Sequence, residues 1–170
     1  MPHEETDIAC AMAHGHLPAP TGERRLVAVF ASPVALQLVH LAAHVGFDCL
    51  VLDPARDLDG ATTVRTAVEA RIDAHTDVVV TDHDRPELGD LLAAVLETPA
   101  RWIGVMGSPR HTAPHVAALQ ERGVAGDQVA RVHRPIGLDI GSRSPAEIAV
   151  STVAGLLAHR AGRRGGVYQA

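Results

Sequence analysis

The sequence predicts an α/β domain in which helices cover both faces of a doubly wound, mostly parallel sheet. Short continuous apolar runs alternate with segments of helical periodicity, the usual pattern of parallel strands joined by crossover helices. Of the 170 residues, 46% are hydrophobic and only 2% aromatic, so the core must be aliphatic and layered, which suits a sheet covered by helices. Gly, Pro, Asp and Ser clusters separate the successive segments.

A strand–helix–strand unit opens the domain. Leu26–Ala31 is an apolar run of strand length, and Ser32-Pro33 follows it as a typical helix start, because Ser caps free N–H groups and Pro fits the first helical position. The helix is expected over Val34–Val45 and ends at Gly46. Phe47–Asp53 is then the second strand, which completes a unit of about 30 residues.

The middle of the chain continues the alternation less regularly. Pro54–Asp59 is expected to be a loop, and Arg65–His75 has only weak helical spacing. Asp77–Thr81 predicts another buried strand, and Pro86–Leu96 predicts a helix with the acidic Glu87 in its first turn.

The same pattern returns in the last third of the chain. Trp102–Met106 predicts a strand, and Gly107-Ser108-Pro109 predicts a turn into a helix that stops at Gly123. Val129–His133 is expected to be a short strand or a connector, and Arg134–Gly141 an ordered loop because a Pro and two Gly stand so close together.

The last helix has the clearest start, because Ser144-Pro145-Ala146-Glu147 places a hydroxyl at the N-cap and a carboxylate three residues later, a capping box. It is expected to run to about His159. We therefore divide the chain into a tail or packing arm over residues 1–24, one domain over 25–161 and a flexible tail over 162–170.

Composition excludes several classes of function. The net charge of −5 argues against nucleic acid or an acidic membrane surface as the partner. All 15 basic residues are Arg, which excludes Schiff-base chemistry and the lysine of a phosphate-binding P-loop. Cys10 and Cys49 form no Cys-x-x-Cys motif, so neither a disulfide framework nor a zinc ribbon is expected.

The expected location is the cytoplasm. The chain starts without a basic segment followed by an apolar one, and no window approaches ~18 uninterrupted apolar residues, so neither a secretory leader nor a membrane segment is expected. We also expect no metal site: the 11 histidines are scattered, and His40 and His44, although spaced for one helix face, have no Glu between them.

A ligand is expected outside the carboxyl ends of the strands, where open α/β sheets bind their ligands. A dinucleotide would need Gly-x-Gly-x-x-Gly/Ala after the first strand, but the chain has Phe30–Ala35, which places Ala31 and Ser32 inside the turn. Asp53 follows Phe30 by 23 positions, close to the ~20 typical of a ribose-binding carboxylate. A nucleotide-dependent oxidoreductase therefore stays open, although the loss of the glycine turn weakens NAD(P) binding.

Two segments resemble a known family. Ile103–His111, read as IGVMGSPRH, and His133–Gly141, read as HRPIGLDIG and followed by Ser144–Ala149, are similar to the Rossmann-type domain of the XdhC/CoxI family. The resemblance covers roughly Arg25 to Arg160. It implies an accessory, chaperone-like protein rather than an enzyme, which binds molybdenum cofactor (molybdopterin) for maturation of a molybdenum hydroxylase such as xanthine or carbon monoxide dehydrogenase.

The resemblance and the fold class together define the expected site. Arg110 and Arg134 can offer bidentate contacts to an anionic cofactor, beside the Ser108 turn and a glycine-rich loop. The cofactor-binding candidates are Ala31, Ser32, Asp53, Gly104, Gly107, Ser108, Arg110, Arg134, Gly137, Asp139 and Gly141. No catalytic residue is assigned. The implied partners are the molybdenum hydroxylase apoenzyme and a sulfurating cysteine desulfurase, and a homodimer is an open alternative.

The sequence departs from the family at three points. Phe30–Ala35 replaces a Gly-Ala-Gly-His-Val-Ala-like turn, and Pro109-Arg110-His111 replaces a basic cluster. The separate amino-terminal domain that the family usually has does not fit within the chain, so we expect a partner to supply it or the chain to be a diverged paralogue. A structural role for the 133–141 loop and a pure protein interaction module remain as alternatives.

Overall fold

In this computed structural model, which describes residues 8, 10–15, 23–108, 110 and 112–166, the described strands form one six-stranded sheet. All pairs are parallel, and the strand order is β3-β2-β1-β4-β5-β6. The strands are β1 (Arg25–Val29), β2 (Asp48–Leu52), β3 (Thr63–Val64), β4 (Thr76–Val80), β5 (Trp102–Val105) and β6 (Val132–His133). The doubly wound parallel sheet that the sequence predicts is confirmed.

The chain reverses its direction of winding at β1, whose two neighbours are β2 and β4. The carboxyl ends of these strands are level, because Val29 is in register with both Leu52 and Val80. The segments that follow the three strands therefore meet at one edge of the sheet, at the switch point where ligands of this architecture bind.

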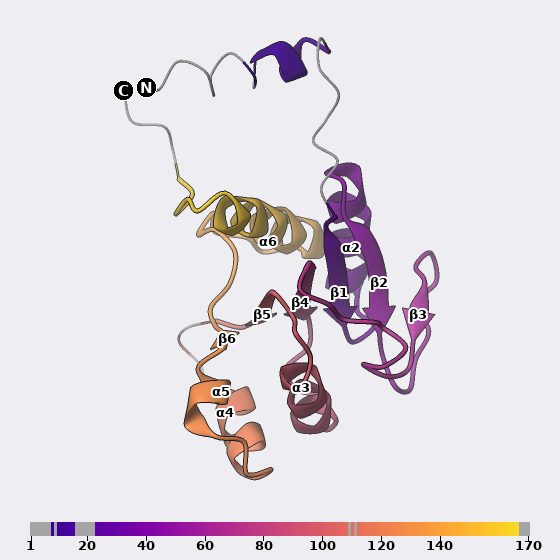
Figure 1. Cartoon of the computed structure of the whole chain (residues 1–170), viewed down its shortest axis with the longest axis vertical. Coiled ribbons are helices and arrows are strands. Elements are labelled where there is room, and N and C mark those ends of the chain that lie inside the picture. Colours follow the sequence, from indigo (N-terminus) through magenta and orange to yellow (C-terminus); the bar gives the residue numbers. More distant parts are fainter. Residues whose placement is uncertain (1–7, 9, 16–22, 109, 111, 167–170) are drawn as a thin grey trace.

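Helices cover both faces of the sheet (Figure 1). One face packs against α2 (Pro33–His44) and α6 (Pro145–Arg160), and the other against α3 (Leu88–Leu96), α4 (Pro114–Gln120) and α5 (Gly126–Val129). Successive residues of each strand face opposite layers, and the aliphatic runs of β1 and β4 supply both. This explains why the central strands are apolar without alternation.

Two of the three predicted Ser-Pro helix starts are confirmed. Ser32 caps α2, with its Oγ accepting from the Ala35 N–H at 3.0 Å. Ser144 caps α6 through a complete capping box, in which its Oγ accepts from the Glu147 N–H and the Glu147 carboxylate accepts from the Ser144 N–H. Both helices begin at the proline that follows the serine.

The third start was predicted wrongly. α4 begins at Pro114 after Ala113, which makes no side-chain cap, and the Ser108 hydroxyl accepts from the Arg110 N–H at 3.2 Å instead. The helix register follows its buried face, where His115 and Leu119 are spaced by one turn. The prediction for Pro109 and His111 lies outside the described residues.

The weak helical spacing of Arg65–His75 does not produce a helix. Turns occupy this region, and β3 precedes it. The Arg65 guanidinium donates to the carbonyl oxygens of Asp53 and Arg56, which ties the segment to the end of β2. α3 begins at Leu88, two residues after the predicted Pro86.

Within the described part of the chain, no helix is both long enough and apolar enough to cross a membrane. The predictions for residues 1–7, 9, 16–22 and 167–170 lie outside the described residues.

Candidate functional site

The β1–α2 turn has the backbone of a glycine turn without the glycine. Phe30 has φ +75°, in the left-handed region that glycine normally fills, and its side chain is completely buried. This conformation costs an L residue on the order of 1–2 kcal/mol, so the surrounding contacts must impose it. The glycine that a dinucleotide-binding motif would have at this position is absent, but the backbone conformation that glycine normally adopts is kept.

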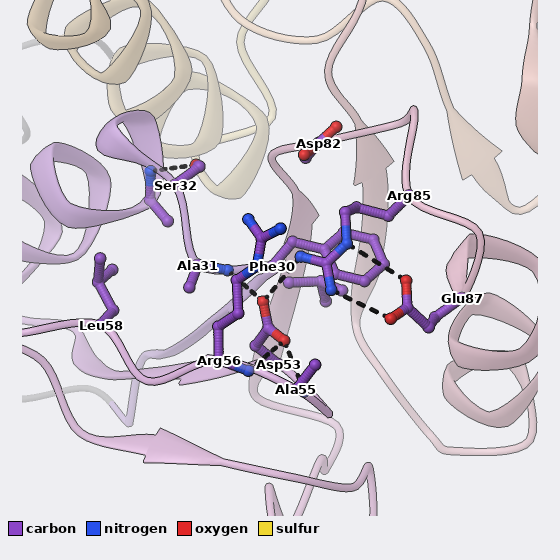
Figure 2. A network of polar contacts seen from close by, with 12 residues as sticks. Phe30, Ala31, Ser32, Asp53, Ala55, Arg56, Leu58, Asp82, Arg85 and Glu87 are labelled. Carbon is purple, nitrogen blue, oxygen red and sulfur yellow. Dashed lines mark hydrogen bonds and ion pairs between the residues drawn. The ribbon is translucent and has the colours of Figure 1, made fainter.

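Asp53, at the end of β2, holds this turn (Figure 2). Its Oδ2 accepts from the Ala31 N–H at 2.8 Å, and its Oδ1 accepts from the N–H groups of Ala55 at 2.8 Å and Arg56 at 2.9 Å. Burial alone would raise the pKa of this fully buried carboxyl, but the backbone donors and the Arg85 guanidinium hold its pKa below the usual value. Asp53 is thus an ionised group whose oxygens are already bonded within the protein.

Arg85, in the loop after β4, contacts the same turn. Its guanidinium lies 3.1 Å from Asp53 Oδ2 and 3.1 Å from Glu87 Oε1, and its Cζ lies 4.8 Å from the centre of the Phe30 ring. Ser32 is held as well, because its Oγ lies 2.9 Å from the Thr81 hydroxyl. Figure 2 shows the side chains of Asp53, Arg85 and Glu87 turned toward one another at the strand ends.

The structure therefore brings Ala31, Ser32 and Asp53 together, as the sequence predicts. In the described residues, however, their polar atoms bond to the protein's own groups, and the Asp53 side chain has no exposed surface. The sequence reasoning missed Arg85 and Glu87, since a charged pair in a loop is ordinarily a solvated feature.

A second group of candidates meets at the carboxyl ends of β5 and β6, which we call the β5–β6 corner. Gly107 has φ +154°, and a Cβ there would stand 2.6 Å from Arg134 Nε, so the guanidinium lies directly on this glycine. Arg134 Nη2 also donates to the Ser108 carbonyl oxygen at 3.0 Å. Arg110 is exposed beside them. Gly107, Ser108 and Arg134 are thus neighbours across 26 positions of sequence.

His115 of α4 belongs to this corner and was not predicted. Its side chain is 4% exposed, and its Nδ1 has no hydrogen-bond partner in the part of the chain that the structure describes. Burial lowers the pKa of His115, and electrostatic interactions with Arg134 and His83 lower it further. A buried polar atom without a partner is unusual in proteins, and here the ring that carries it is within electrostatic range of Arg134. The only hint in the sequence is its spacing of four from the buried Leu119.

The glycine-rich loop after β6 packs against α6. Gly137 has φ +84°, and a Cβ there would stand 2.5 Å from Ser151 Oγ. The Leu138 N–H donates to the Ser151 carbonyl at 3.2 Å, and the Ser151 hydroxyl donates back to the Leu138 carbonyl at 2.5 Å. Gly155, on the next turn of α6, faces Gly137, and the loop and the helix approach each other closely there as well.

The remaining candidates occupy different environments. A Cβ on Gly104, inside β5, would collide with the Trp102 ring and with Ile136, so this glycine makes room for packing. Asp139 and Gly141 are exposed, and the Asp139 carboxylate makes no side-chain hydrogen bond to another described residue. No group of three or more His, Cys, Asp or Glu side chains suited to a metal ion occurs among the described residues.

The strand order, the level carboxyl ends and the turn at Phe30 define a Rossmann-like α/β domain. Residues 26–156 match the family of the XdhC Rossmann domain, and the chain belongs to this family.

Three relatives give the family its context. The chain is 33% identical to the uncharacterized protein YqeB of Escherichia coli over 84% of its own length, and 28% identical to a probable xanthine dehydrogenase subunit of Bacillus subtilis over 80%. A crystal structure described as a xanthine dehydrogenase from Bacillus halodurans superposes with a TM-score of 0.64 at 26% identity over 82% of the chain. The chain spans 28%, 43% and 45% of these three proteins respectively.

Proposed function

We propose that this domain is an accessory protein in the maturation of a molybdenum hydroxylase of the xanthine or carbon monoxide dehydrogenase type. Its support is the family membership over residues 26–156, together with two relatives that are named after xanthine dehydrogenase. In this proposal the domain is a binding protein rather than an enzyme, and the hydroxylase apoenzyme and a sulfurating cysteine desulfurase are its partners.

The proposed ligand is molybdenum cofactor, held at the β5–β6 corner. The observation behind this choice is the buried His115 Nδ1 without a partner among the described residues, on a ring whose pKa the charge of Arg134 lowers. The cofactor presents a phosphate and dithiolene sulfurs, and Arg is the side chain best suited to phosphate. The residues present therefore fit an anionic ligand.

The chain's own groups would divide the work. Arg134 and His115 would bind the anionic end, and the Ser108 hydroxyl and the backbone around Gly107 would orient it. The exposed Arg110, Asp139 and Gly141 would form the rim that meets the apoenzyme. When bound, the cofactor supplies the molybdenum–dithiolene centre that the hydroxylase uses, and this domain would hold and shield it.

Anaerobic equilibrium binding of freshly released molybdenum cofactor tests the proposal. Arg134→Gln and His115→Phe should each weaken binding by roughly tenfold, since a hydrogen bond to a charged group contributes about 1.5–3 kcal/mol. Arg110→Ala and Asp139→Asn should weaken it less.

The matched control is Arg71→Gln, which removes an exposed cation before β4, at the amino-terminal edge of the sheet. It should bind like the unmodified chain. Circular dichroism checks that every variant is folded. Equal binding by the Arg134, His115 and Arg71 variants would contradict the proposed site.

A further inference from the structure

A cavity of about 230 Å³ lies on the α6 face of the sheet, and nothing in the proposed function uses it. It lies between the start of β5, the loop after β6 and the last turns of α6. Its walls include Trp102, His133, Ile136, Leu138, Leu156 and His159, and the exposed Arg163 and Arg164 also line it.

One wall consists of three rings. The His133 imidazole stacks on the Trp102 indole, with centroids 5.4 Å apart and an interplanar angle of 8°. His159 packs against both rings, at 6.0 Å from Trp102 and 6.1 Å from His133. Burial lowers the pKa of His133, and the neighbouring His159 lowers it further, so this ring is a neutral stacking surface near neutral pH.

Ion pairs fix this wall in place. The buried Asp77 accepts from Arg101 Nε at 2.6 Å and from Arg160 Nε at 2.8 Å. Arg101 Nη1 in turn lies 3.2 Å from His159 Nδ1. Because a guanidinium can only donate, this nitrogen accepts, which leaves the proton of a neutral ring on Nε2. The rings are thus oriented before any ligand arrives.

The other walls are mainly apolar, and the two cations Arg163 and Arg164 line the cavity separately. Ile136, Leu138 and Leu156 give the cavity its aliphatic side, whereas the guanidinium groups of Arg163 and Arg164 form no hydrogen bond or ion pair with other described residues. Small-molecule sites commonly combine aromatic and apolar walls with a few placed polar groups. Aromatic and imidazole rings bind flat heterocycles by stacking, and Arg binds anions.

We propose that this cavity binds a purine nucleotide. The purine ring lies against the Trp102–His133–His159 wall, and the phosphate meets Arg163 and Arg164. The proposal uses other side chains than the cofactor site at the β5–β6 corner. The two sites meet at the end of β6, where His133 precedes Arg134, but Trp102 starts β5 at its amino end, whereas the corner lies at its carboxyl end.

The cavity contains its own reporter, because Trp102 is the single tryptophan of the chain. Guanosine 5′-monophosphate (GMP) is titrated against the whole chain and followed by tryptophan emission, excited where the probe absorbs little, and by calorimetry. Guanosine tests the ring without the anion, and inorganic phosphate tests the anion without the ring.

GMP should bind saturably and change the emission, and guanosine should bind roughly fivefold more weakly, as expected for the loss of two exposed charge contacts. Arg163→Gln/Arg164→Gln, on an exposed segment, should reduce GMP to the level of guanosine. His133→Ala should weaken both probes roughly tenfold, the usual effect of losing one stacking ring. Arg134→Gln and Arg71→Gln should leave GMP binding unchanged, which separates this site from the cofactor site.

Absence of saturable GMP binding at millimolar concentration would overturn the proposal. So would an emission change caused by phosphate alone, or equal binding of GMP by the unmodified chain and Arg163→Gln/Arg164→Gln.

Discussion

At the residue scale, Asp53 joins segments that are far apart in the sequence. It receives N–H groups from the β1–α2 turn and from the loop after β2, and it pairs with Arg85 after β4. The sequence places a carboxylate at this strand end by its distance from Phe30. The sequence could not show that the Asp53 oxygens would bond to the protein's own groups, because Arg85 has no fixed spacing from Asp53 in the chain.

Replacing Asp53 with Asn should lower the free energy of unfolding by about 3 kcal/mol, because the change leaves Arg85 without its buried partner and turns an N–H₂ toward backbone donors. Urea unfolding measures the loss. Asp57→Asn is the control, since its carboxylate pairs with Arg65 on the surface and should contribute less than about 1 kcal/mol. Similar losses in both variants would contradict the role of Asp53.

The Asp53–Arg85 pair also predicts how the stability of the fold depends on pH. Because the folded state holds the pKa of Asp53 below its usual value, its stabilisation is present above the unfolded carboxyl pKa of about 3.9 and is lost as pH falls through the folded pKa. The unmodified chain should therefore lose more stability than Asp53→Asn on acidification below about pH 4.

His115 predicts a second loss of stability on acidification, which comes from a buried imidazole rather than from a carboxylate. Its pKa is lowered by burial and then by electrostatic interactions with Arg134 and His83, so the unfolded chain takes up its proton first as pH falls below about 6.5. Stability should thus fall as the pH drops below about 6.5, and His115→Phe should flatten this slope. His44→Gln, at an exposed position, is the control. An unchanged slope in His115→Phe would show that this imidazole is not held neutral.

At the scale of elements, helix starts were predictable only where serine and proline stand next to a buried periodic segment. Ser32 and Ser144 met this condition, and their caps formed as expected. Ser108 was followed by a segment whose buried face begins only at His115, so tertiary packing moved the helix start to Pro114. Local chemistry permits a cap, and the register of the buried face decides whether it forms.

The contact between the 135–138 loop and α6 gives an element-scale prediction. Gly137→Ala should lower the free energy of unfolding by roughly 2–3 kcal/mol, because its positive φ and the Ser151 side chain both oppose a Cβ. Gly141→Ala is the matched control: it also has a positive φ, at +69°, but a Cβ there meets nothing within 4 Å, so only about 1 kcal/mol should be lost. Equal losses in a urea titration would show that the loop does not need this close approach.

At the scale of the whole molecule, alternation of apolar runs and helical segments was enough to predict the parallel sheet. The strand order beyond the first two strands was inferred from the fold class, and the structure shows it as β3-β2-β1-β4-β5-β6. The short β3 and β6 have too few residues for a pattern to form, which is why sequence reasoning missed one and left the other open.

The site was less predictable than the fold. Motif matching indicated Gly107, Ser108 and Arg134, which do meet at one corner. His115 and Arg85 have no motif, and only the packing of α4 and of the loop after β4 brings them to the strand ends. The domain thus combines a dinucleotide-type turn whose polar groups bond to one another with a second corner where the charge of Arg134 acts on the buried His115 imidazole.

Parallel titration of the unmodified chain with released molybdenum cofactor and with NADPH, under anaerobic conditions, tests this account most directly. Saturable binding of the cofactor without binding of NADPH at millimolar concentration is the expected result, because Asp53 and Arg85 are bonded to each other at the dinucleotide position. Saturable binding of NADPH with none of the cofactor would contradict the account, since the β1–α2 turn would then open to a ligand while the β5–β6 corner stayed empty.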